Sequence, residues 1–114
     1  MQIIQDEVRC RGVKFYVQGD GGEEIARAFL YIMFNDLHRQ PFGLVEDVFV
    51  SEEEGIRGRG VGTALVKKVI ETARMENCYK LIATSRYSRD KIHRWYGRLG
   101  FKDYGKEFWM EISK

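Results

Sequence analysis

The sequence predicts a small mixed domain, of the α/β or α+β class, with a mostly antiparallel sheet, a central parallel pair of strands and two packed helices. Alternating apolar residues near the start of the chain indicate two strands. A strand, a helix and a second strand then follow one another in residues 44–84, which is the order that produces a parallel pair. The chain has 114 residues, of which 44% are hydrophobic. We therefore expect a single domain over residues 1–114.

The first two predicted strands form a hairpin. Apolar residues alternate with polar ones in residues 8–17 and again in residues 25–34. Between them, residues 19–22 read Gly-Asp-Gly-Gly, which is a strong turn signal and makes the two strands antiparallel. Gly12 interrupts the alternation of the first strand, so we expect a bulge or a break into two short strands near that point.

The rest of the chain supplies the parallel unit and two further elements. Residues 44–50 predict an apolar strand, residues 60–75 an amphipathic helix, and residues 80–84 a short apolar strand that we expect to be central. Residues 88–99 predict a second helix, because apolar side chains repeat at helical spacing and a glycine follows them. Residues 107–112 alternate again and predict a last strand.

Composition and charge exclude several classes of protein. A net charge of +2 is too small to indicate nucleic-acid binding, and no apolar run is long enough to span a membrane. Cys10 and Cys78 stand alone, without the spacing of metal ligands, which is typical of reduced cysteines in a reducing compartment. We expect a cytoplasmic protein with no metal, no nucleic-acid partner and no membrane association.

A glycine- and arginine-rich stretch precedes the first predicted helix. Residues 57–62 read Arg-Gly-Arg-Gly-Val-Gly. A helix N-terminus exposes unpaired N–H groups and a partial positive charge, glycine admits a ligand close to the backbone, and arginine adds charge-assisted bonds to phosphate. The stretch predicts a site for the phosphate tail of a nucleotide or coenzyme. The alternative is a flexible hinge before an ordinary surface helix. The Lys-Ser/Thr end of a nucleotide-triphosphate loop is absent from the sequence.

Two motifs of this chain resemble a known family. Residues 57–62 fit the (Arg/Gln)-x-x-Gly-x-(Gly/Ala) signature of the GNAT superfamily of acetyl-CoA-dependent N-acetyltransferases. Residues 96–101, Tyr-Gly-Arg-Leu-Gly-Phe, resemble its second hallmark, and the strand at residues 45–50 resembles a third. The two helices that usually follow the first strand of that family are missing, because residues 19–24 form only a turn.

A narrower likeness is to glucosamine-6-phosphate N-acetyltransferases, and it lies in residues 46–48 and 78–80. At the broader level, the family implies a mixed sheet, acetyl-CoA as cosubstrate and an amine as acceptor. The coenzyme would contact the backbone of one strand, the glycine-rich turn and the start of the second helix. The residues at these implied coenzyme-binding positions are Val48, Phe49, Val50, Arg57, Gly58, Arg59, Gly60, Val61, Gly62, Thr63 and Arg89.

The resemblance also implies catalytic roles. An amine acceptor is protonated at neutral pH and must lose a proton before it attacks the thioester, which a carboxylate can accept. Glu46 and Asp47 are adjacent on a predicted strand and should point to opposite faces, and we favour Glu46 as the base. Tyr96 would lie near the thioester sulfur and assist the leaving thiolate. The alternatives are a solvated strand acid for the carboxylates and core packing for Tyr96.

We therefore expect an enzyme that transfers an acetyl group to a primary amine of a small molecule or peptide by direct attack in a ternary complex. A non-catalytic acyl-CoA-binding or regulatory module is the main alternative, because the missing helices often build part of the acceptor site. A nucleic-acid-binding module that uses the basic second helix is a third hypothesis. A homodimer is a further expectation, since a second copy would cover sheet surface left exposed by the missing helices.

Overall fold

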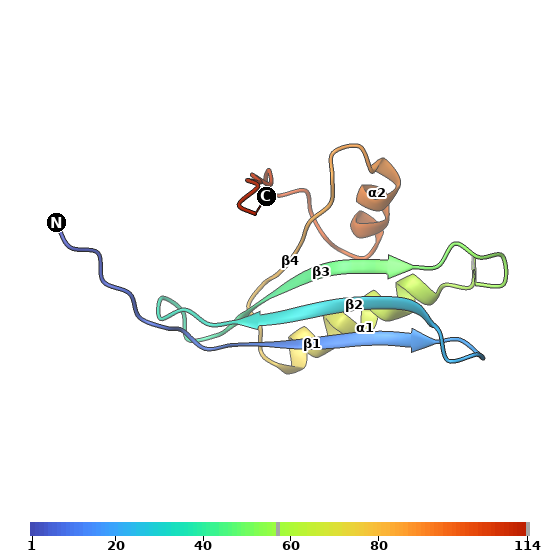
Figure 1. Cartoon of the computed structure of the whole chain (residues 1–114), viewed down its shortest axis with the longest axis horizontal. Coiled ribbons are helices and arrows are strands. Elements are labelled where there is room, and N and C mark those ends of the chain that lie inside the picture. Colours follow the sequence, from blue (N-terminus) through green and yellow to red (C-terminus); the bar gives the residue numbers. More distant parts are fainter. Residues whose placement is uncertain (57, 114) are drawn as a thin grey trace. The chain divides into compact units, whose positions relative to one another are not determined.

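A computed structural model describes residues 1–56 and 58–113 of the chain, so Arg57, the first residue of the glycine-rich stretch, lies outside the described residues. The elements in chain order are β1 (Cys10–Gln18), β2 (Glu24–Met33), β3 (Phe42–Val50), α1 (Val61–Met75), β4 (Leu81–Ala83) and α2 (Asp90–Arg98). They are labelled in Figure 1 and belong to two compact units, Met1–Ala83 and Thr84–Lys114.

The first unit is built on a four-stranded sheet in the order β1-β2-β3-β4. The β1–β2 and β2–β3 pairs are antiparallel, and β3 pairs in parallel with β4 through three residues of each strand. The predicted hairpin and parallel pair are therefore confirmed. A tight turn joins β1 to β2, in which the Gly22 N–H donates to the Gly19 carbonyl at 3.0 Å. This turn stands where the resembling family usually has two helices.

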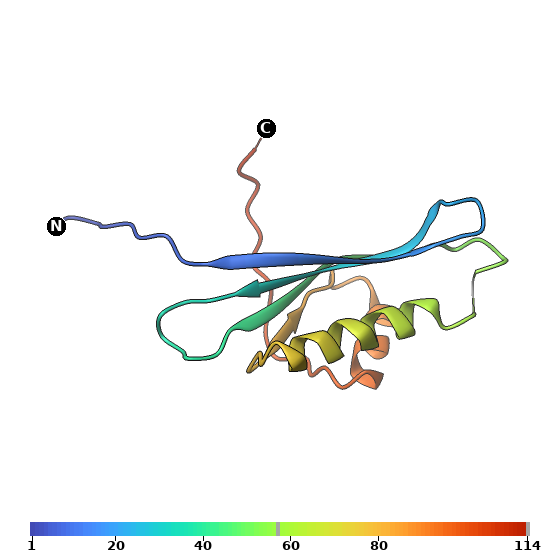
Figure 2. The same cartoon turned by 90° about the horizontal axis from the view of Figure 1, so that it is seen from below.

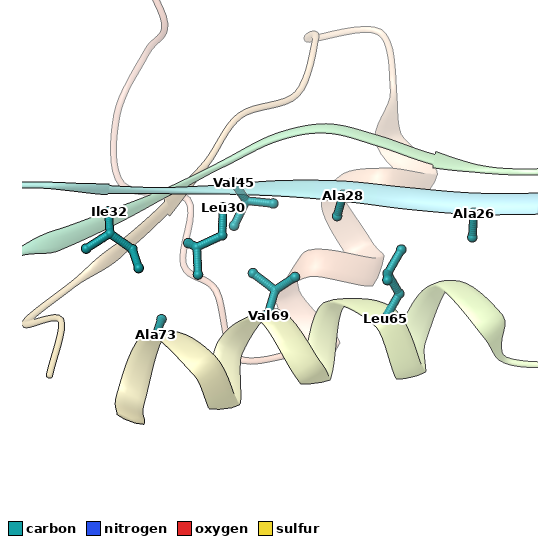
Figure 3. Packing of buried hydrophobic residues seen from close by; sticks show 8 residues of the cluster. All are labelled: Ala26, Ala28, Leu30, Ile32, Val45, Leu65, Val69 and Ala73. Atoms are coloured by element: carbon teal, nitrogen blue, oxygen red, sulfur yellow. The ribbon is translucent and has the colours of Figure 1, made fainter. Parts of the chain in front are cut away.

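Helix α1 covers one face of this sheet (Figure 2). Alternate residues of β2 and every fourth residue of α1 meet in an apolar core between the two layers (Figure 3). The cluster consists of Ala26, Ala28, Leu30, Ile32, Val45, Leu65, Val69 and Ala73. Both periodicities were predicted from the sequence, and the structure confirms them.

An ion pair joins the first strand to the end of α1. The Arg11 guanidinium contacts the Glu76 carboxylate, and this hydrogen bond holds the pKa of Glu76 below its ordinary value. A carboxyl group with a lowered pKa in the folded state contributes stability above its unfolded pKa, and that stability is lost as the pH falls through the folded pKa. Both side chains are substantially exposed, so the contribution is small.

The bulge or strand break predicted near Gly12 is wrong. Pairing between β1 and β2 runs from Cys10 to Val17 without a shift, and the irregularity of this hairpin falls after Val17. A Cβ atom on Gly12 would lie 3.1 Å from two ring atoms of Tyr31 on the neighbouring strand. The glycine therefore makes room for this ring, and its break in the apolar pattern does not alter the strand.

The strand predicted at residues 107–112 is also wrong, because residues 101–113 have no regular secondary structure. The predicted alternation is present, but Phe108, Met110 and Ile112 are 92%, 77% and 83% exposed. A strand needs a neighbour for its N–H and C=O groups. The second unit offers none over residues 84–113, where α2 is its one regular element. Without this strand, β4 is at the edge of the sheet and is not central as expected.

Helix α2 follows the predicted pattern within the second unit. Its apolar side chains Ile92, Trp95 and Tyr96 are half-buried, together with Leu99 directly after the helix, while the intervening residues are exposed. Over residues 1–56 and 58–113, no helix has the length and the apolar character that crossing a membrane requires.

The core makes a first prediction. Leu30 is fully buried at the centre of the cluster, so Leu30→Ala should lower the free energy of unfolding by about 2–5 kcal/mol. Met75→Ala, at a side chain that is 78% exposed, is the control and should change stability by less than about 0.5 kcal/mol. Urea denaturation measures both, and equal losses in the two variants would contradict the assigned core.

Candidate active site

Strand β3 is irregular at its two acidic residues. Arg27 of β2 pairs with Phe49 and Phe29 pairs with Glu46, so that Asp47 and Val48 stand opposite a single β2 residue. Asp47 has a φ of 51°, in the left-handed region that few residues other than glycine adopt. This is a β-bulge, a feature that is frequent beside active sites.

The bulge changes which side chains of β3 face the core. Val45 packs in the core, and the next residues of β3 packed against it are Val48 and Val50, so the spacing is three residues at the bulge. The expectation that Glu46 and Asp47 point to opposite faces assumed strict alternation, and this assumption does not hold across the bulge. Glu46 is half-buried, whereas Asp47 is exposed.

The bulge also marks the point where β3 and β4 separate. Their parallel pairing ends at Val45 and Ala83. Beyond it, Val48–Val50 continue as a strand with β2 on one side, and the described part of the sheet has no strand paired on their other side. An extended ligand can hydrogen-bond to such an edge as if it were an added strand. This geometry fits the backbone role implied for Val48, Phe49 and Val50.

The turn before α1 has the shape that its glycines predicted. Gly58 and Gly60 have φ values of 78° and 73°, and a Cβ atom on either would meet nothing within 4 Å. Gly60 is the N-cap residue directly before α1, and its carbonyl accepts the first helical hydrogen bond from the Ala64 N–H at 3.0 Å. No side chain of the described residues caps this helix, and its first turn holds no acidic residue. The helix start is therefore suited to an anion.

Arg59 stabilises the loop before this turn through two hydrogen bonds. Its backbone N–H donates to the Ile56 carbonyl at 3.3 Å, and a guanidinium nitrogen donates to the Gly55 carbonyl at 3.0 Å. A guanidinium has five N–H groups, so this bond leaves others that can contact a phosphate. The phosphate contact that the resemblance implies for Arg57 cannot be placed, because Arg57 lies outside the described residues.

A groove of about 600 Å³ begins beside Arg59 and Gly60 and runs between β1 and α1.

The strand end and the helix start are held together by packing. Val48 and Val50 of β3 and Val61 of α1 all pack against the same apolar core. The open edge of Val48–Val50 and the start of α1 are therefore both anchored by the hydrophobic core of the first unit. Over the described residues, no group of three or more His, Cys, Asp or Glu side chains is placed to hold a metal ion.

In the second unit, the sequence Leu99-Gly100-Phe101, two residues beyond Gly97, ends helix α2 behind Tyr96. The Phe101 N–H donates to the Tyr96 carbonyl at 3.0 Å, the Gly100 N–H donates to the Gly97 carbonyl at 3.1 Å, and Gly100 has a φ of 105°. These bonds form a Schellman motif, in which glycine ends the helix and the next residue packs back on it. The Tyr96 ring lies 5.3 Å from the Phe101 ring and 5.4 Å from the Trp95 ring, so the helix end fixes its position.

Arg89 is the residue directly before α2. It is exposed, and its N–H donates to the Arg86 carbonyl at 3.1 Å. His93 contacts the same carbonyl through Nε2 at 2.8 Å, so both residues stabilise the turn that begins the helix. Arg89 and Tyr96 thus belong to the second unit, while Glu46, Asp47 and the glycine-rich turn belong to the first.

Comparison with known proteins identifies the family. The model of the acetyltransferase (GNAT) family matches residues 3–101, so the chain belongs to this family. A glucosamine 6-phosphate N-acetyltransferase of Trypanosoma brucei brucei is 33% identical over 70 residues, which are 61% of this chain and 44% of that protein. A probable glucosamine 6-phosphate N-acetyltransferase 2 of Oryza sativa subsp. japonica is 35% identical over 63 residues, which are 55% of this chain and 35% of that protein.

The fold agrees with this membership. The crystal structure of a Trypanosoma brucei acetyltransferase superposes with a TM-score of 0.79 at 27% identity, and the match covers 89% of this chain and 69% of that one. Glucosamine-6-phosphate N-acetyltransferase from Arabidopsis thaliana has the same fold, with a TM-score of 0.77 at 19% identity over 90% of this chain and 67% of that one. The chain spans less than half the length of the two curated relatives.

The bulge makes a second prediction. Because Asp47 is exposed and has a positive φ, its conformation rather than its packing should limit substitution. Asp47→Val should lower stability by about 1–3 kcal/mol, because a β-branched residue is strained there. Asp47→Gly and Asp47→Asn should stay near the wild type, since both residues tolerate this conformation. Urea denaturation compares the three, and a loss in Asp47→Gly as large as in Asp47→Val would refute the explanation.

Proposed function

We propose that this chain is an acetyl-CoA-dependent N-acetyltransferase that acts on a primary amine of a small molecule or peptide. The observation that carries the proposal is the pairing of two features on one core. These are an uncapped helix start behind a glycine-rich turn and a bulged strand whose edge is open at Val48–Val50. The first suits a diphosphate and the second suits an extended amide-bearing chain, and coenzyme A contains both.

The first-turn residues Val61, Gly62 and Thr63 would bind the coenzyme pyrophosphate through their backbone N–H groups, with Gly58, Gly60 and the two arginines of the turn around it. The N–H groups of the first turn of an α-helix point along the helix axis toward an incoming anion. A coenzyme diphosphate would also gain from the field of the α1 dipole, which no acidic residue of the first turn weakens. Arg89 would add a cation from the start of α2.

Catalysis would proceed by direct attack. Glu46 would take a proton from the ammonium of the acceptor, whose nitrogen then attacks the thioester carbonyl carbon. The oxyanion that forms would accept a hydrogen bond from the Val48 N–H. As the carbon–sulfur bond breaks, the Tyr96 hydroxyl would donate its proton to the leaving thiolate. Asp47 would serve as the base only if Glu46 does not.

Cys78 is not suited to carry the acetyl group. Burial raises the pKa of its thiol, which keeps it protonated and a poor nucleophile at neutral pH. It follows the far end of α1, a helix of 15 residues that begins at the glycine-rich turn. Such a helix is about 22 Å long. Transfer through an acetyl-cysteine is therefore disfavoured, and a direct ternary complex is the simpler route.

The names of the relatives suggest which acceptors to test first. Two curated relatives are named as acting on glucosamine 6-phosphate, so this amino sugar is the first amine to assay, followed by simpler primary amines and short peptides. We also propose a cytoplasmic location, in keeping with the two free cysteines.

The second candidate function is a non-catalytic acyl-CoA-binding module. The tight turn between β1 and β2 favours it, since helices at this place often build the acceptor site in the family. A module of this kind would bind acetyl-CoA and release no free thiol with any amine of the panel.

Coenzyme binding gives a third prediction. Isothermal titration calorimetry with acetyl-CoA should show one site, and Gly62→Asp should weaken it at least about tenfold, because its carboxylate repels the diphosphate. An acid in the first turn favours the helix, so this variant should stay folded. Gly105→Asp adds the same charge at an exposed glycine of the second unit and is the control. No binding to the folded wild type would refute the proposal.

Turnover gives a fourth prediction. Glu46→Gln should lower the rate of thiol release about 10²–10⁴-fold, and Tyr96→Phe should lower it while leaving acetyl-CoA affinity nearly unchanged. Cys78→Ala should retain turnover. Full turnover in Glu46→Gln would move the role of base to Asp47 or water, and complete loss in a folded Cys78→Ala would contradict direct attack. Binding without turnover in the wild type would support the module.

A further inference from the structure

Strand β1 is an edge of the sheet, paired with β2 on one side and with no other strand in the described residues. An unpaired edge is a template for a further strand, and natural proteins usually cover or block it. β1 is nine residues long, holds no proline, and pairs regularly from Cys10 to Val17. Its one lysine, Lys14, is neutralised by Glu24 at 2.5 Å. The edge is therefore long, regular and little protected.

A groove borders this edge. It has a volume of about 600 Å³ and lies between β1 and the first half of α1. Phe15, Val17 and Leu65 give it an apolar lining. Its cations are Lys14, Arg59 and Lys68, of which Lys68 also lies 3.9 Å from the exposed Glu71 carboxylate. A strand that joined the edge of β1 would place every second side chain over this groove. The groove thus suits a segment that is partly apolar and carries acidic residues.

The N-terminal arm, residues 1–9, is such a segment. It has no regular secondary structure, and it extends beyond the start of β1 away from the sheet (Figures 1 and 2). Ile3 and Ile4 are 81% and 78% exposed, and the acids Asp6 and Glu7 follow them. In an added strand, one isoleucine and one acid of this segment would lie over the groove, which complements its apolar lining and its cations.

The arm is poorly placed to fill the groove of its own chain. The Arg9 carbonyl accepts a hydrogen bond from the Phe34 N–H at 3.3 Å, so the extended path of β1 already begins at Arg9. To fold back along β1, the arm would need a tight turn directly before this point, and residues 1–9 hold no glycine or proline and only Asp6 among the other residues common in turns. The arm of another molecule meets no such obstacle.

We propose that the N-terminal arm of one copy adds as an antiparallel strand to β1 of a second copy, with its side chains over the groove, and that the exchange is reciprocal. Arm and edge are consecutive segments of one chain, so a two-fold axis near Cys10 satisfies both exchanges at once. The result is a closed dimer in which each copy covers the open edge of the other.

Sedimentation equilibrium of the full chain tests this proposal. The wild type should form a dimer between about 1 and about 100 µM, and the double variant Ile3→Glu/Ile4→Glu should raise the dissociation constant at least about tenfold. Ile112→Glu changes an isoleucine of similar exposure, 83%, near the other end of the chain and should have no effect. All positions are exposed, so circular dichroism should confirm that the variants are folded.

Two further variants probe the groove. Ala64→Glu, at an exposed residue that lines it, should weaken the dimer by placing a carboxylate near the acids of the incoming arm. Lys68→Glu should also weaken it, and adding Glu7→Lys should recover at least part of the loss, because the new lysine and carboxylate attract. A wild type that is monomeric at about 100 µM would overturn the proposal. A dimer unaffected by both the arm variant and Ala64→Glu would overturn it equally.

Discussion

The packing of α1 on β2 and β3 is the constraint on which the rest of the first unit depends. Leu65, Val69 and Ala73 recur at every fourth position and meet alternate residues of β2 in one cluster. This contact fixes the direction of the helix, and Val61 continues the same stripe to its first turn. The N–H groups of the first turn therefore lie beside the end of β3 because apolar side chains place them there.

Several residues with a positive φ stand at points where chemistry is expected, whereas Gly22 and Asn77 shape turns away from them. Gly58 and Gly60 shape the turn before α1, Asp47 forms the bulge in β3, and Gly100 ends α2 behind Tyr96. Such conformations are unfavourable for most residues and persist where surrounding structure holds them. In each case the residue adjoins a helix or strand that is well packed or regularly hydrogen-bonded. This neighbouring element stabilises the unfavourable positive φ.

Several features of the candidate site could be predicted because their cause is local. Gly58 and Gly60 indicate a turn with an unusual backbone conformation. Gly100, between Tyr96 and Phe101, indicates the end of a helix, because helix capping depends on a few consecutive residues. The bulge at Asp47 was missed, although two adjacent acids in an apolar strand were a signal of irregular pairing. A bulge depends on the register with β2, which lies elsewhere in the chain.

Sequence alone determined the periodicity of each element, the family signatures and the order of strands and helices as far as α2, because these reside in residues near one another. Tertiary structure decided which patterns became paired structure. Gly12 breaks the apolar alternation, but β1 continues through it because the missing side chain leaves room for the Tyr31 ring. Residues 107–112 have the alternation of a strand but do not form one. The physical reason is that a strand is completed by hydrogen bonds to a distant partner, whereas a helix bonds within itself.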